Sequence, residues 1–235
     1  MKGTKMKDKL LVYSGGMDST TLLYDLAESI GLAVSFNYGS NHAEKELAMA
    51  AKNCKKLGIK HIVINMQEAF KDIKSGLTSG ADNIPEGHYA EDSMKDTVVP
   101  FRNGIMLSVA AGIADSNGLK YVMLASHAGD HAVYPDCRPS FNTPMFEAIY
   151  NGTENGVSVL APYAPLTKRD IALIGKYSGI DYANDTWSCY KANSDKHCGR
   201  CSTCVERIWA LRDMDDTEYV ETEFAIQTLK DAGEW

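Results

Sequence analysis

The chain has 235 residues, of which 44% are hydrophobic and 23% are charged, as in ordinary globular proteins. Lysine and arginine number 24 against 31 aspartates and glutamates, giving a formal net charge of −7, which disfavours sequence-independent binding to nucleic acid. No apolar run approaches the roughly 20 residues that a membrane helix needs, and the lysine-rich start has no apolar signal core behind it. We therefore expect a cytoplasmic protein that does not enter a membrane.

A strand expected over residues 9–13 runs into a Ser-Gly-Gly-x-Asp-Ser motif and then into a helix expected over residues 18–30. Two adjacent glycines let the backbone turn sharply and approach a ligand, and the free N–H groups at the start of the helix attract an anion. The motif lacks the Gly-Lys-Ser/Thr ending of a Walker A loop, and its carboxylate indicates a bridging magnesium ion. The sequence therefore predicts a phosphate site formed by Ser14, Gly15, Gly16, Asp18, Ser19 and Thr20.

Further strands are expected over residues 32–38, 61–66 and 121–125, with helical patterns between them. The helices over residues 18–30 and 42–57 should end at Gly31 and Gly58. This alternation favours an α/β fold with a doubly wound, mostly parallel sheet, in which ligands bind beyond the carboxyl ends of the strands. The loops at residues 14–19, 37–41 and 126–130 should converge there.

Residues 68–98 are polar and contain several glycines, and this stretch is too long for a plain connector. It predicts a mobile lid or a partner contact, or else a surface insertion with no part in the chemistry. After Pro100, an apolar helix is expected over residues 102–116.

Four cysteines near the C-terminus have the spacing C-x8-C-x2-C-x2-C. Four thiolates at about 2.3 Å fill the shell of a tetrahedral ion and leave no open position for a substrate. The spacing therefore predicts a structural zinc site formed by Cys189, Cys198, Cys201 and Cys204. A disulfide framework is disfavoured in the cytoplasm, and an iron–sulfur cluster is the other alternative. We expect residues 186–235 to form a small zinc-binding lobe after a nucleotide-binding domain of residues 1–185.

A polar string, Tyr134-Pro135-Asp136-Cys137-Arg138, follows the fourth expected strand. An aspartate can accept two hydrogen bonds from a guanine-type N–H face, and an arginine can form a fork onto a carboxylate. The residues alone are equally consistent with a rigid proline turn that carries a surface ion pair.

Several motifs together resemble the 7-cyano-7-deazaguanine synthase family (QueC) of the ATP pyrophosphatases. They are the Ser-Gly-Gly-x-Asp-Ser-Thr string, Tyr38-Gly39 followed by His42-Ala43-Glu44, Val99-Pro100-x-Arg102-Asn103, the string around Tyr134, Pro165-Leu166-Thr167-Lys168 and the four cysteines. The resemblance implies an adenine nucleotide alpha-hydrolase-like fold, a homodimer and the use of ATP and zinc. It also implies the conversion of 7-carboxy-7-deazaguanine and ammonia into a nitrile precursor of queuosine.

The resemblance also implies roles for individual residues. Asp18, Lys168 and Arg102 are expected to be catalytic, the two cations through contacts with ATP phosphate or an acyl-adenylate. The residues expected to bind the substrate are Asn103, Asp130, Tyr134, Asp136 and Arg138. Three histidines, His42, His127 and His131, are candidate proton shuttles.

Five positions depart from the family pattern: Ser40, Asn41, Phe101, Ala132 and Val133. Because they put the shape of the base pocket in doubt, alternatives stay open. One is a related enzyme that couples the deazapurine to an amine of a protein partner. Another is a tRNA-modifying thiolase or ligase that would use Cys137, and a third is a non-enzymatic interaction module.

Overall fold

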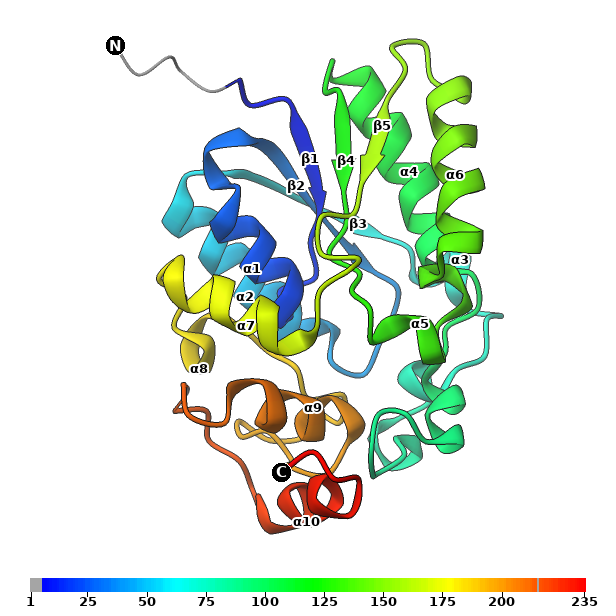
Figure 1. The fold of residues 1–235 in the computed structure, drawn as a ribbon. Coiled ribbons are helices and arrows are strands. Elements are labelled where there is room, and N and C mark those ends of the chain that lie inside the picture. The colour runs from blue at the N-terminus through cyan, green and yellow to red at the C-terminus, as the bar shows by residue number, and fades with distance from the viewer. Residues whose placement is uncertain (1–5, 215) are drawn as a thin grey trace.

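A five-stranded parallel sheet forms the centre of the computed structural model, which describes residues 6–214 and 216–235 (Figure 1). The strand order is β3-β2-β1-β4-β5, with β1 at Lys9–Val12, β2 at Ile30–Asn37, β3 at Lys60–Asn65, β4 at Tyr121–Met123 and β5 at Ser158–Leu160. The chain extends the sheet from β1 to β3 and then returns to the other side of β1 with β4. Such a reversal opens a crevice at the carboxyl ends of β1 and β4, where sheets of this kind bind ligands.

Helices cover both faces of the sheet, and a smaller group lies beyond the carboxyl ends of the strands (Figure 1). One face carries α1 (Met17–Asp25), α2 (Ala43–Leu57) and α7 (Lys168–Tyr177), and the other carries α4 (Arg102–Ser116) and α6 (Pro139–Gly152). The longer helices of the C-terminal part are α9 (Ser202–Leu211) and α10 (Glu223–Asp231). The remaining short helices are α3 (Gln67–Phe70), α5 (Asp130–Val133) and α8 (Tyr182–Asp185).

The strands supply two hydrophobic cores, one on each face of the sheet. Leu10 and Val122 pack into the core beneath α4, whereas Leu11 and Met123 pack into the core beneath α1 and α7. Neighbouring strand residues point to opposite faces, and all four side chains have no exposed surface. The predicted doubly wound, parallel α/β fold is confirmed.

The helix expected over residues 18–30 was too long. Observed α1 ends at Asp25, a single 3-10 turn (Ala27–Ser29) follows, and β2 already begins at Ile30. Gly31 therefore belongs to a strand and does not end a helix. A Cβ atom on Gly31 would lie 2.6 Å from the carbonyl oxygen of Lys7, so glycine is needed there for close backbone approach. Gly58 does end α2 as expected, with a left-handed φ of 64°.

The expectation that no apolar run approaches membrane-spanning length also needs correction. The stretch Asp92–Ser116 is long and apolar enough by composition. However, it consists of a 3-10 helix, Asp92–Thr97, and α4, separated by a break in which Phe101 has a φ of 58°. Buried residues of α4 such as Leu107 and Ala110 pack in the same core as the strands, so this stretch is a core helix of the sheet and the turn before it.

The C-terminal part is fastened to the rest of the chain by a buried arginine. Arg207 on α9 has no exposed surface, and it donates hydrogen bonds to the carbonyl oxygen of Tyr182 at 2.7 Å and to the hydroxyl of Thr186 at 2.7 Å. These bonds fix α9 beside α8. The division of the chain at residue 185 stays a prediction.

Candidate active site

The phosphate loop lies between β1 and α1, where the glycine pair allows very close packing. Gly15 has a φ of 97°, and a Cβ atom on it would overlap the backbone carbonyl of Glu46 on α2. Gly16 is the N-cap of α1. The Ser14 hydroxyl accepts a hydrogen bond from the Gly16 N–H at 3.0 Å and lies 2.9 Å from the Ser19 hydroxyl. The sequence therefore builds a tight turn that leads into the first turn of α1, where unpaired helix N–H groups suit an anion.

A cavity of about 270 Å³ opens at this loop, at the carboxyl ends of the strands. Most of the predicted site residues line it: Ser14, Gly16, Asp18, Ser19, Arg102, Asn103, Asp130, Tyr134 and Lys168. The other residues predicted to bind phosphate or substrate do not line the cavity: Gly15, Thr20, Asp136 and Arg138. Gly15 shapes the turn from behind, and Thr20 points inward, with its hydroxyl 3.2 Å from that of Tyr13.

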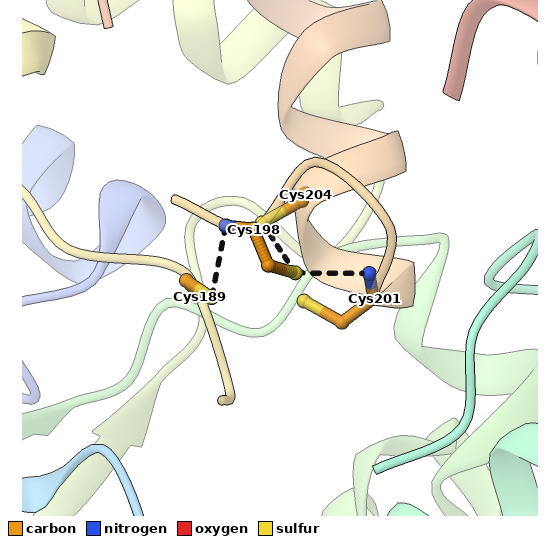
Figure 2. A group of neighbouring side chains, drawn as sticks. All are labelled: Cys189, Cys198, Cys201 and Cys204. Carbon is orange, nitrogen blue, oxygen red and sulfur yellow. Dashed lines mark hydrogen bonds between the residues drawn. The ribbon is translucent and has the colours of Figure 1, made fainter. Parts of the chain in front are cut away.

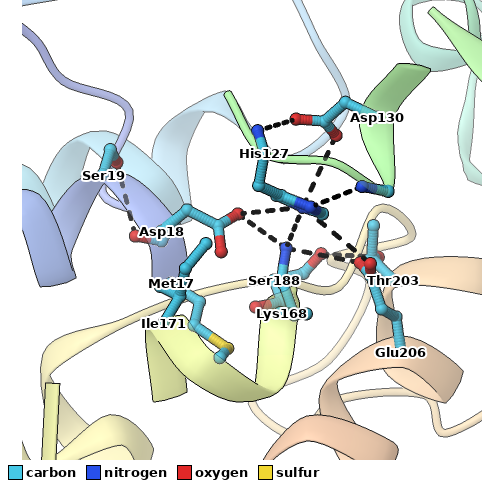
Figure 3. Close-up of polar contacts among 12 residues, drawn as sticks. Met17, Asp18, Ser19, His127, Asp130, Lys168, Ile171, Ser188, Thr203 and Glu206 are labelled. Carbon is cyan, nitrogen blue, oxygen red and sulfur yellow. Dashed lines mark hydrogen bonds and ion pairs between the residues drawn. The ribbon is translucent and has the colours of Figure 1, made fainter. Parts of the chain in front are cut away.

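A cluster of charged groups occupies one side of the cavity (Figure 3). The Lys168 ammonium lies 2.6 Å from Asp18 Oδ2 and 3.3 Å from Glu206 Oε2. Burial alone would lower the pKa of Lys168, but the carboxylates of Asp18, Glu206 and Asp130 outweigh burial and raise this pKa above its usual range. Lys168 therefore stays cationic, and it links α1, α7 and α9 at the edge of the phosphate loop.

His127 completes this cluster in a defined orientation. Its Nδ1 accepts a hydrogen bond from the Gly129 N–H at 3.1 Å, and its own backbone N–H donates to Asp130 Oδ2 at 2.9 Å. Its Nε2 lies 3.4 Å from the Lys168 ammonium nitrogen, 3.6 Å from Asp130 Oδ1 and 3.9 Å from Glu206 Oε1.

Tyrosines surround Arg102 on another wall of the cavity. Its guanidinium donates to the Tyr38 hydroxyl at 3.2 Å, and it lies 6.0 Å from the centre of the Tyr134 ring. The Tyr134 and Tyr190 hydroxyls are 3.3 Å apart. Among the residues that the structure describes, no carboxylate forms an ion pair with Arg102, so its charge is available to an anionic ligand.

Asp136 and Arg138 have other partners in the structure. Asp136 accepts a hydrogen bond from the Asn103 N–H at 2.8 Å, which satisfies a free donor in the first turn of α4. Arg138 is exposed and donates to the carbonyl of His131 at 2.9 Å. The structure thus assigns both residues to the turn that precedes α6 and not to the cavity. A role for them in substrate binding would need a movement of this turn.

Cys137 lines the cavity beside Asn103, but little of its surface is exposed. It is 3% exposed, its sulfur lies 3.2 Å from the amide nitrogen of Asn103, and burial raises its pKa far above the usual range. A buried thiol that stays protonated is a poor nucleophile, which argues against the thiolase alternative.

Most of the five positions that depart from the family pattern lie outside the cavity, so they alter its shape little. Phe101 is 57% exposed and packs edge-on against Phe141 outside the cavity. Asn41 holds the segment after α3, because its amide donates to the carbonyl of Gly76 at 3.2 Å and accepts from the Gly80 N–H at 3.1 Å. Of the five, only Ser40 and Val133 line the cavity.

The polar stretch at residues 68–98 forms short helical turns that close one side of the site. Leu77 and Met94 are buried, and Tyr89 and Met94 line the cavity. Glu86 bridges this stretch to the C-terminal part through ion pairs of 2.7 Å with Lys191 and 2.7 Å with Arg200. The stretch is therefore a wall of the cavity in this structure, and its opening as a lid stays a prediction.

The four cysteines converge as their spacing predicts (Figure 2). Their sulfur atoms all lie within 4.8 Å of one another, and none forms a disulfide. Sulfurs at about 2.3 Å from a tetrahedral ion are about 3.8 Å apart, and the Cys198 and Cys204 sulfurs are 3.8 Å apart. Backbone N–H groups of Arg200 and Cys201 donate to the Cys198 sulfur, which favours the thiolate. The geometry fits one tetrahedral metal ion.

Sequence reasoning missed two carboxylates of the cavity, Glu206 and Glu46. Glu206 is an 8% exposed acid on the inner face of α9, next to the buried Val205. The sequence signal for Glu206 was an acidic residue within the apolar pattern of this helix. Glu46 was hidden among the other charges of α2, and no periodic pattern distinguishes it.

The chain is similar to known proteins over most of its length. The model of the family described as Queuosine biosynthesis protein QueC matches residues 8–215. A curated 7-cyano-7-deazaguanine synthase from Porphyromonas gingivalis is 55% identical over 216 residues, which cover 91% of this chain and 97% of the relative. Another, from Desulfotalea psychrophila, is 45% identical over 220 residues, which cover 92% of this chain and all of the relative. A solved NMN synthetase from Francisella tularensis aligns with a TM-score of 0.46 and 15% identity over 79% of this chain and 68% of that one.

Proposed function

Because the chain belongs to the QueC family of queuosine biosynthesis proteins, we propose that it converts 7-carboxy-7-deazaguanine and ammonia into 7-cyano-7-deazaguanine in an ATP-dependent reaction. The observation that carries this proposal is the shared cavity of the phosphate loop and the two cations Lys168 and Arg102. Such a cavity suits an enzyme that brings a nucleotide and an anionic substrate together.

In the first step, the substrate carboxylate attacks the α phosphorus of ATP, and pyrophosphate leaves into the loop at residues 14–19. Fixed donors aimed at charge that develops in the transition state contribute about 2.7–4 kcal/mol each, and a rigid turn with Gly16 as the N-cap provides them without reorganisation. Lys168, held at 2.6 Å from Asp18, lies at the edge of the loop and balances the charge of the phosphates.

In the following steps, ammonia displaces AMP from the acyl-adenylate and leaves an amide. A second ATP activates the amide oxygen, and departure of that oxygen with AMP gives the nitrile. The two rounds use the same groups, because each transfers an adenylyl group to an oxygen on the same carbon.

Two metal ions belong to the proposal. Asp18 Oδ1 is buried without a hydrogen-bond partner in the described part of the chain, which fits a magnesium ligand, and a bound magnesium would neutralise phosphate charge. The four-cysteine site suits zinc in a structural role, since sulfur would fill all four positions. This site holds the start of α9, the helix that brings Glu206 to Lys168.

The chain is further proposed to act in the cytoplasm as a homodimer on small-molecule substrates, without nucleic acid. Coupling of the deazapurine to a protein amine remains the second candidate, because the cavity contains Ser40 and Val133 at two of the departing positions.

Incubation of the zinc-loaded protein with ATP, magnesium, ammonium and 7-carboxy-7-deazaguanine tests the proposal. We expect AMP, pyrophosphate and 7-cyano-7-deazaguanine to form together. Zinc-loaded, folded protein that forms neither AMP nor nitrile would contradict it.

A further inference from the structure

Glu46 is a carboxyl group of the cavity that no hydrogen bond from the described residues holds. Its side chain is 19% exposed and lines the cavity. In the parts of the chain that the structure describes, no group donates a hydrogen bond to its carboxyl, and His42 Nε2 lies 3.7 Å from its Oε2. A partly buried carboxyl that accepts no hydrogen bond costs stability, so its presence points to a ligand.

The position of Glu46 beside the phosphate loop restricts what that ligand can be. Its Oε1 lies 3.1 Å from where a Cβ atom on Gly16 would stand. The backbone of α2 is fixed there, because the Glu46 carbonyl packs directly against Gly15. The carboxyl is therefore held at the N-terminal end of α1, next to the expected location of the phosphorus and carbon atoms that react.

The charge state of Glu46 suits proton transfer at neutral pH. Burial raises the pKa of Glu46 to about 8, although the positive charge of Arg102 acts in the opposite direction. Burial, together with Arg102, lowers the pKa of His42 to about 3, so this imidazole is neutral and supplies no cation. A general base works best when its pKa lies near the operating pH.

We propose that Glu46 is the catalytic base that removes a proton from the substrate nitrogen in this site. The inference rests on the proposed function. When ammonia attacks the acyl-adenylate, a carbon–nitrogen bond forms, the bond from that carbon to the AMP oxygen breaks, and AMP leaves with the electron pair. One proton passes from the nitrogen to Glu46. In the second round, the nitrogen of the adenylated amide still carries two protons. Glu46 first gives the proton of the first round to solvent and then removes these two protons one after the other, passing the first of them to solvent as well. As the last proton leaves, the nitrogen forms its third bond to carbon, the bond from that carbon to the AMP oxygen breaks, and AMP departs with the electron pair.

The test compares Glu46→Gln with Glu44→Gln, an exposed glutamate of the same helix. Three rates are measured: exchange of pyrophosphate into ATP that depends on the carboxylic acid, amide and nitrile formation from ammonium, and hydroxamate formation from hydroxylamine. Hydroxylamine is unprotonated at neutral pH and depends less on a base. Thermal unfolding checks that each variant is folded, and Glu46→Asp carries the same test if E46Q does not fold.

We expect E46Q to lose ammonium-dependent turnover by about 100-fold or more, while exchange and hydroxamate formation stay near wild-type rates and E44Q is unchanged. Near-normal turnover of E46Q with ammonium would overturn the assignment. A parallel loss of exchange would also overturn it and would instead show that Glu46 binds the N–H face of the base. Absence of acid-dependent exchange in the wild type would show that the proposed function itself has failed.

Discussion

Gly15 is the position at which a single added methyl group should damage the phosphate loop most. In Gly15→Ala, the new Cβ atom would overlap the Glu46 carbonyl oxygen and lie 3.1 Å from the Ala50 nitrogen. Both atoms belong to the backbone of α2, which cannot rotate away as a side chain can. The variant must therefore move α2, reshape the turn, or unfold.

The loss of stability expected for Gly15→Ala has two components. A residue with a Cβ atom in a left-handed conformation costs about 1–2 kcal/mol, and forcing an atom into a packed interior adds about 1–3 kcal/mol. Their sum, about 2–5 kcal/mol, is a large share of the 5–15 kcal/mol that stabilises a typical domain. Gly58→Ala is the matched control, since Gly58 has a φ of 64° but nothing within 4 Å of an added Cβ atom.

Urea unfolding and acid-dependent exchange of pyrophosphate into ATP measure the two consequences. Gly58→Ala should lose only the conformational component, about 1–2 kcal/mol, and keep its exchange activity. Gly15→Ala should lose more stability than the control and lose exchange. If the two variants were equally stable and equally active, the close packing of α2 on the loop would not matter as we argue.

Three other substitutions test separate parts of the site. Lys168→Met leaves Asp18 and Glu206 without their shared cation, so the free energy of unfolding should fall by about 3–5 kcal/mol and exchange of pyrophosphate into ATP should be lost. An unchanged urea unfolding curve would contradict this. Cys204→Ser should release the bound zinc and lower the melting temperature, as metal analysis and calorimetry would show, whereas full zinc retention would refute the assigned ligand set. Cys137→Ser should keep nitrile formation measured by chromatography, and its complete loss would revive the thiolase alternative.

The sequence predicted those features that local patterns determine. The residues of α4 formed the predicted helix over the same range, Gly58 ended α2, and the four cysteines met in space. The alternation of apolar strands with helices was enough to predict that the strands of the sheet run parallel.

Features that depend on approach between distant segments were not predicted. Gly31 looked like a helix end because its contact with the carbonyl of Lys7 is invisible in one dimension. The strand β5, which has three residues, was not predicted. Glu46 and Glu206 became site residues only because α2 and α9 pack against the carboxyl ends of the strands.

Transfer of oxygen from the substrate carboxylate to AMP is the most direct test of the central claim, which is attack on the α phosphorus of ATP at the loop of residues 14–19. The enzyme is supplied with 7-carboxy-7-deazaguanine labelled with oxygen-18 in its carboxylate, and the products are separated by mass spectrometry. The mechanism predicts that the label appears in AMP and is absent from pyrophosphate. Label in inorganic phosphate, or AMP without label, would contradict it.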